Sequence, residues 1–181
     1  MSLLNDLRMP TFKRLIAMLL ILGITTLAHA GTENSDYTNY GSDSLSGTND
    51  AGADDNTAIG QGAMSGNLTS TADSNTAIGN KALFANSGGG YNTAVGSLAL
   101  EANTTGSYNI ASGWNALADN TTGTGNIASG VLALYNNISG TYNVANGYAA
   151  LLSNTSGIYN IASGYSALYS NTSGNYNTAS G

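Results

Sequence analysis

The sequence predicts an all-β fold, a repetitive parallel β-solenoid of the β-roll or β-helix kind with 17 residues in each coil. The main observation is a phrase that recurs every 17 residues and reads Asn-Thr/Ile-Ala-x-Gly, then Ala-Leu, then Asn-Thr-Ser/Thr-Gly and usually Tyr. Self-similarity at a fixed period is typical of a solenoid, in which each unit buries its surface against the next. The asparagines that open the phrase are Asn75, Asn92, Asn109, Asn126, Asn143, Asn160 and Asn177.

The length and composition of the unit exclude a helical repeat. A pair of packed helices needs about 33 residues, and the glycine, asparagine, serine and threonine of each unit disfavour helix interiors. The unit instead suits one coil of two short strands of about five residues and two turns, stacked on the next coil at about 4.8 Å. The repeats cover residues 56–181, since an earlier copy of the phrase starts at Asn56. A degenerate coil precedes it, with Gly41 and Leu45 at two positions of the phrase.

The first strand of each coil has two faces, because successive side chains of a strand point in opposite directions. In residues 160–164 one face holds Asn, Ala and Gly, and the other holds Ile161 and Ser163. Early coils reverse this order on the second face, as Thr76 and Ile78 do. Each coil thus keeps one branched aliphatic residue, which we interpret as core volume that moves by two positions. The alternation does not decide which face is the interior.

The second half of each coil carries Ala-Leu, and we expect its leucines to stack into a buried column. The Asn-Thr-Ser-Gly segment that follows places turn-forming Asn and Gly where the chain reverses. The leucines of the predicted core column are Leu83, Leu100, Leu117, Leu134, Leu151 and Leu168.

The asparagines form two columns, one at the strand start and one at the turn. Stacked Asn side chains can hydrogen-bond along a ladder, and Asn is also a favoured turn residue, so we expect both roles. The turn asparagines also lie in Asn-x-Ser/Thr sequons, which we interpret as turn chemistry rather than as glycosylation sites. These sequon residues are Asn67, Asn103, Asn120, Asn137, Asn154 and Asn171.

Residues 1–30 have the character of a secretory signal peptide. Lys13 and Arg14 precede an apolar run, and Ala28-His29-Ala30 is a small-x-small cleavage site. The apolar run is too short for a permanent membrane anchor, so we expect no integral anchor in this chain. Residues 31–55 are polar and acidic, and we expect a lead-in that merges into the degenerate first coil.

Cleavage after Ala30 would remove every His, Arg and Pro, and the chain has no Cys. One lysine, Lys81, then stands against nine acids, a net charge of −8, which excludes nucleic-acid binding by phosphate neutralisation. Catalysis needs a tuned acid, base or nucleophile, so we predict no enzyme, no catalytic residues and no cofactor. We favour a solvated acidic leader over a calcium site, and predict no metal site, because no calcium-loop spacing occurs among Asp43, Asp50, Asp54 and Asp55.

Tyrosines recur at the last position of the phrase. A tyrosine column can be a core edge, a subunit interface or an exposed ligand-binding stripe, and we favour the first two. This possible interface consists of Tyr91, Tyr108, Tyr142, Tyr159 and Tyr176.

The phrase Asn-Thr-Ala-Ile-Gly, at residues 56–60 and 75–79, resembles the head repeats of trimeric autotransporter adhesins of the YadA type. The 17-residue spacing is more similar to repeats of bacterial and phage tail-fibre-like proteins. The resemblance covers about residues 56–181 and implies a trimeric or fibrous surface structure used in adhesion. The coiled-coil stalk, membrane barrel and chaperone domain of those families are absent from this chain.

We therefore expect a secreted bacterial protein with a structural or adhesive role outside the cell or at its surface. Its expected partner is itself, as a homo-oligomer, either a trimer or a head-to-tail filament, with a surface or host receptor as a further partner. The filament follows from residues 177–181, which would leave an uncapped strand edge. Two alternatives stay open: a fragment of a larger receptor-binding adhesin or tail-fibre-like protein, and an ice- or carbohydrate-binding solenoid.

Overall fold

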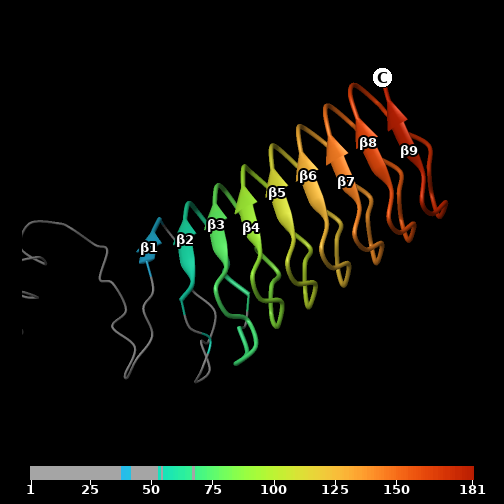
Figure 1. Ribbon diagram of the computed structural model, residues 1–181. Helices are drawn as coiled ribbons and strands as arrows, with labels where there is room; N and C mark the ends of the chain where they lie inside the picture. The colour runs from blue at the N-terminus through green and yellow to red at the C-terminus, as the bar shows by residue number, and fades with distance from the viewer. Residues whose placement is uncertain (1–37, 42–52, 54, 67) are drawn as a thin grey trace, which may run out of the picture. The chain divides into compact units, whose positions relative to one another are not determined.

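The structure, a computed structural model that describes residues 38–41, 53, 55–66 and 68–181, confirms the parallel β-solenoid (Figure 1). The described strands form one nine-stranded sheet in sequence order, and each strand pairs in parallel with the next. The strands are β1 (Thr38–Tyr40), β2 (Thr57–Ile59), β3 (Thr76–Ile78), β4 (Thr93–Val95), β5 (Ile110–Ser112), β6 (Ile127–Ser129), β7 (Val144–Asn146), β8 (Ile161–Ser163) and β9 (Thr178–Ser180).

All the described residues lie in one compact unit, Glu33–Gly181. The expected signal peptide at residues 1–30 lies outside the described residues, as do Leu45 and most of the lead-in. Within the lead-in, β1 pairs with β2 and places Thr38 beside Thr57. Among the residues that the structure describes, no helix is long and apolar enough to cross a membrane.

The 17-residue period of the sequence matches the register of the sheet, because residues 17 positions apart pair in adjacent strands. Ala77 pairs with Ala94, and Ala94 pairs with Ala111. The longer early coil adds two residues without disturbing the pairing, because Ala58 still pairs with Ala77. The additional residues are therefore accommodated outside the strands.

Each coil contains one strand of three residues, so the expectation of two strands of about five residues is wrong. The Ala-Leu segment is a compact turn instead, because its leucines and the residue two places before each adopt left-handed backbone angles. Leu98 has φ 61° and Leu100 has φ 53°. This turn still bonds to the next coil, since the Leu83 amide donates to the Ala99 carbonyl at 3.0 Å.

The interior of the solenoid is built from the strand alanines, the strand-start asparagines and the Ala-Leu turns. The middle residue of the strand is fully buried in β2–β8, as are the leucines from Leu83 to Leu151. Leu168 is half-buried and packs against the same core. Full burial of a leucine side chain contributes roughly 1.5–3 kcal/mol, which offsets the roughly 1–2 kcal/mol cost of its left-handed backbone.

The branched aliphatic residues of the strands lie on the outside, so their interpretation as core volume is wrong. Ile78 and Ile110 are more than one third exposed, whereas the alanine between the outward positions is fully buried. The interior is filled by the leucine column and the asparagine amides, and next to these only alanine fits on the strand. The aliphatic residue therefore occupies different positions on the outer surface of the solenoid in early and in late coils.

The corner after each strand requires glycine because neighbouring corners approach closely. Gly96 has φ 135°, and a Cβ on it would lie 2.7 Å from the carbonyl carbon of Gly113. Any side chain here would separate the coils. The corner glycines thus fix the distance at which the strands stack.

Leu134→Asp should destabilise the protein by about 3–5 kcal/mol, because an unpaired charge would be buried in the middle of the leucine column. Thermal unfolding followed by circular dichroism measures the loss. Ile138→Asp is the matched control, since Ile138 is 49% exposed and its substitution should cost less than about 1 kcal/mol. Equal melting of the two variants would show that the leucine column does not carry the core.

Candidate functional site

The strand-start asparagines form a continuous amide ladder inside the solenoid, the strand ladder. The Oδ1 of Asn92 accepts from the backbone amide of Asn109 at 3.0 Å and from its Nδ2 at 3.1 Å. The same pair of bonds recurs at each step from Asn75 to Asn177, with distances of 2.9–3.2 Å. Each coil is thereby joined to the next through both side chain and backbone.

The turn asparagines form a second column, the turn ladder, with one amide bond at each step. The Nδ2 of Asn120 donates to Oδ1 of Asn103 at 2.8 Å, and the Nδ2 of Asn137 donates to Oδ1 of Asn120 at 2.7 Å. The members of the turn ladder are Asn86, Asn103, Asn120, Asn137, Asn154 and Asn171.

The two ladders meet at one glycine carbonyl in each coil from Asn75 onward, whereas in the longer coil before it Asn56 donates to the Ala72 carbonyl. The carbonyl of Gly123 accepts from Nδ2 of Asn109 at 2.8 Å and from Nδ2 of Asn120 at 3.0 Å. A Cβ on Gly123 would collide with Oδ1 of Asn120 and with the carbonyl of Gly140. Glycine is therefore required at this turn position. The equivalent residues are Gly89, Gly106, Gly140, Gly157 and Gly174.

No buried side-chain nitrogen or oxygen in the described part of the chain lacks a hydrogen-bond partner. In each ladder asparagine from Asn92 to Asn154, both amide hydrogens donate, one to the preceding ladder asparagine and one to a glycine carbonyl. This bonding also explains the sequons, because Asn103, Asn120, Asn137 and Asn154 are fully buried. A glycan on any of these four residues is incompatible with the stacked coil. Asn67 lies outside the described residues.

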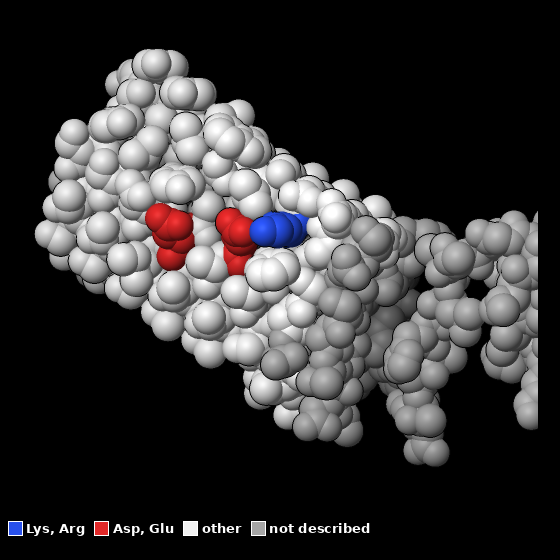
Figure 2. All heavy atoms as spheres, turned by 180° about the vertical axis from the view of Figure 1, so that it is seen from behind, with Lys and Arg blue, Asp and Glu red and all other residues white. Residues whose placement is uncertain are grey.

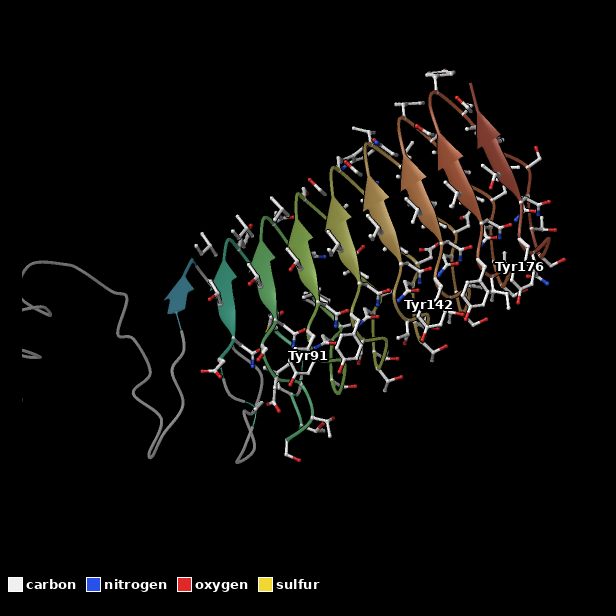
Figure 3. All side chains as sticks on the ribbon, viewed as in Figure 1. Tyr91, Tyr142 and Tyr176 are labelled. Carbon is white, nitrogen blue, oxygen red and sulfur yellow. The ribbon has the colours of Figure 1, made fainter. Side chains whose placement is uncertain are left out.

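The predicted tyrosine column lies on the surface, at the end of the coils where the strands begin (Figure 3). Its rings are 46–73% exposed, so the column is not part of the core. Tyr91 and Tyr108 stack with centroids 5.0 Å apart, and Tyr142, Tyr159 and Tyr176 stack at 5.1 and 5.2 Å. Gly125 interrupts the column, and a Cβ there would lie 2.7 Å from the ring of Tyr142.

A second exposed aromatic column follows the glycine corner. Tyr148 and Tyr165 stack at 5.2 Å, and Trp114 occupies the same position three coils before Tyr165. All three side chains are close to half-exposed or more. The solenoid therefore exposes aromatic and aliphatic side chains in rows along its axis.

The charges of the described chain are confined to its first half. They are Asp55, Asp73, Lys81, Glu101 and Asp119, and residues 120–181 contain no charged side chain. Lys81 lies 4.0 Å from Glu101 and 5.1 Å from the centroid of the Phe84 ring. On the face shown in Figure 2 a basic side chain lies beside an acidic one, and most of the surface around them is uncharged. No cluster of three or more His, Cys, Asp or Glu that could hold a metal ion occurs among the described residues.

Comparison with known proteins gives no relative for this chain. No family model matches it, no curated protein matches it, and no solved structure matches it.

Two features of the site were not predicted from the sequence. The first is the glycine carbonyl that joins the ladders, whose signal is the glycine three residues after every turn asparagine from Asn86 onward. The second is the left-handed leucine, for which the sequence contains no signal, because leucine disfavours that conformation. The ladders saturate the interior, so chemistry with other molecules is left to the outward columns.

Asn137→Asp should destabilise the protein by about 2–4 kcal/mol, because a carboxylate cannot donate to Oδ1 of Asn120 or to the Gly140 carbonyl. Asn136→Asp is the matched control, since it adds the same charge one residue away, at a half-buried position outside both ladders. Denaturant unfolding measures both variants. Equal stability of the two variants would contradict the structural role of the turn ladder.

Burial raises the pKa of Asp119 above its ordinary value of 3.8. A raised pKa means that the folded state favours the protonated carboxyl of Asp119. The protonated carboxyl therefore costs no stability below pH 3.8, and the folded state becomes less stable as the pH rises through the folded pKa and the buried carboxyl ionises. Asp119→Asn should therefore match the native protein at low pH and be the more stable of the two at neutral pH. Asn136 occupies the equivalent position one coil later, so the substitution fits. A stability difference that does not change with pH would contradict this account.

Proposed function

We propose that this chain is a secreted bacterial structural or adhesive protein, which forms an extracellular fibre or surface appendage by coil stacking and subunit assembly. The observation that carries the proposal is the regular, exposed rows of aromatic and aliphatic side chains on a solenoid whose residues 120–181 carry no charged side chain. Aromatic residues are enriched at protein interfaces, and large exposed apolar patches mark interaction sites. The ladders hold these rows in fixed positions, so many weak contacts can form together.

The charge distribution supports contact with neutral surfaces and with further copies of the chain. Residues 120–181 carry no charge, so electrostatic repulsion does not oppose association of this half. Contacts made there depend on hydrophobic burial and hydrogen bonding, which salt screens little. Association should therefore persist at high ionic strength.

The resemblance to trimeric autotransporter adhesin heads and tail-fibre-like repeats supports the same role. The features that this chain shares with those repeats are the Asn-Thr-Ala-Ile-Gly phrase at residues 56–60 and 75–79 and the parallel coils. In this proposal the subunits assemble as trimers or filaments, the tyrosine column is the contact surface, and a surface or host receptor is the external partner.

Carbohydrate or ice binding is a second candidate, favoured by one observation. In β2, β3 and β4 the outward positions are a threonine followed by Ile or Val, as at Thr57 and Ile59, in a regular array. The array covers three coils and ends at Ile110, where the order reverses. A thermal hysteresis assay tests ice binding, and glycan-array binding tests carbohydrate recognition.

Replacing Tyr142, Tyr159 and Tyr176 together by serine should reduce assembly and adsorption to neutral surfaces at least severalfold, with the fold kept. Ser74 occupies this position naturally with φ 56°, so serine fits the backbone. Light scattering, negative-stain microscopy and surface adsorption of the secreted chain measure the effect at low and high salt. A monomeric native protein that adsorbs to nothing would overturn the proposal.

A further inference from the structure

The sheet has an outer face made by the first and third residues of each strand from β2 to β8. The first-position residues are Thr57, Thr76, Thr93, Ile110, Ile127, Val144 and Ile161, and the third-position residues are Ile59, Ile78, Val95, Ser112, Ser129, Asn146 and Ser163. None of them is charged. In every coil one is a branched aliphatic residue and the other is a smaller polar residue.

The aliphatic column changes sides once, between β4 and β5. It runs along the third position in β2, β3 and β4, and along the first position in β5, β6, β7 and β8. The pairing of Val95 with Ser112 and of Thr93 with Ile110 marks the change. The outer face therefore has two halves. In one half the large side chain is at the third position of the strand, and in the other half it is at the first.

The outer face exposes a row of aliphatic side chains, and a continuous exposed apolar surface marks an interaction site. Six of the seven aliphatic residues are 37–48% exposed, and Val144 is less exposed. In a face-to-face pair, six strands at about 4.8 Å and a width of about five residues, which includes the residue on each side of the three-residue strand, give about 475 Å² for each copy, or about 950 Å² for the pair. That area is in the range of weak or transient interfaces, which bury less than about 1,200 Å².

We infer that two copies of this chain pack through their outer faces, with their solenoid axes antiparallel and related by a two-fold axis along the strand direction. This inference rests on the self-association in the proposed function. It makes a face-to-face pair the unit of assembly, which favours a filament of pairs over a trimer, and it leaves the exposed tyrosine column for contacts between pairs. In such a pair β2 faces β7 of the other copy, β3 faces β6, and β4 faces β5. The interface is isologous, so both halves of each copy are covered.

The change of columns makes this pairing fit. Ile78 of one copy lies over Ser129 of the other and beside its Ile127, so each level holds one aliphatic side chain from each copy. The same arrangement brings Val95 over Ser112 and beside Ile110. Without the change, aliphatic residues would meet head-on in one column and threonines in the other. Interdigitated side chains of this kind fill the space between packed sheets, which lie about 10 Å apart.

Charge favours the antiparallel arrangement over a parallel one. Residues 55–119 hold four acids and one lysine, a net charge of −3, and residues 120–181 hold none. Parallel axes would place the two acidic halves together. Antiparallel axes place each acidic half against an uncharged half, so the acids of the two copies lie farther apart.

Single cysteines at the corners test the geometry, since the chain has no native cysteine. Gln61 follows β2, Ser97 follows β4 and Tyr148 follows β7. With a short bismaleimide linker, Ser97→Cys should cross-link to its twin, whereas Gln61→Cys should not. A mixture of Gln61→Cys and Tyr148→Cys copies should yield the heterodimer. Equal linkage of the Gln61→Cys and Ser97→Cys twins in an assembling protein would overturn the antiparallel pair and leave self-association standing.

A variant with uniform columns tests the packing. Exchanging first and third positions in β5, β6, β7 and β8, so that each strand reads as β2 to β4 do, keeps nearly the same composition. The exchange should lower the dimer association constant at least tenfold in sedimentation, with unchanged circular dichroism, because β2 to β4 already fold with this order. Undiminished dimerisation would overturn the inference. A native protein that is monomeric but still adsorbs to surfaces would overturn it too, and would leave the adhesive role in place.

Discussion

The amide ladders are the interaction on which the structure depends. Each strand-start asparagine bonds to the next by side chain and backbone, and each turn asparagine bonds to the next by its amide. Both donate to one glycine carbonyl in each coil from Asn75 onward. A net contribution of roughly 0.5–1.5 kcal/mol for each bond is modest, but the bonds repeat in every coil and polarise one another. The ladders therefore hold successive coils in one register and fix the position of every outward side chain, at the spacing that the corner glycines allow.

The ladders also permit backbone conformations that would otherwise be unfavourable. Leucine, tyrosine and the residue two places before the leucine are left-handed in most coils, as Leu98, Leu100 and Tyr108 show. Each costs roughly 1–2 kcal/mol. Stacking holds them, because the leucine amides from Leu83 to Leu151 bond to the adjacent coil and the leucines from Leu100 to Leu151 each lie between two other leucines of the column. Such a coil is stable only among its neighbours, and this is why the repeat is the unit of the fold.

The period and the composition of the unit together were sufficient to predict the parallel solenoid, since a helical repeat needs about 33 residues and this composition disfavours helices. They did not reveal the interior of the strand, because alternation is symmetric and Ile78 is larger than Ala77. The deciding fact is the width of the coil, which the opposite wall of leucines and amides leaves too small for isoleucine. The ladder asparagines could be located by spacing, whereas their shared acceptor and the left-handed leucines depend on how adjacent coils meet. The same register predicts which residues point outward, such as Tyr142, but it does not predict which molecules these residues contact.

The stabilities of two deletion variants show whether the fold depends on the register of the ladders or only on the number of residues removed. The protein without residues 126–142 loses 17 residues, so Asn143 takes the place of Asn126 above Asn109 and both ladders close. The protein without residues 126–133 loses about half a unit, so the next strand-start asparagine after Asn109 is 26 residues away and nine residues more than one coil holds cannot be stacked. The 17-residue deletion should keep the native circular dichroism and a melting temperature close to that of the full chain. The shorter deletion should lose several kcal/mol of stability. Equal damage from both deletions would contradict an account in which the amide ladders carry the fold.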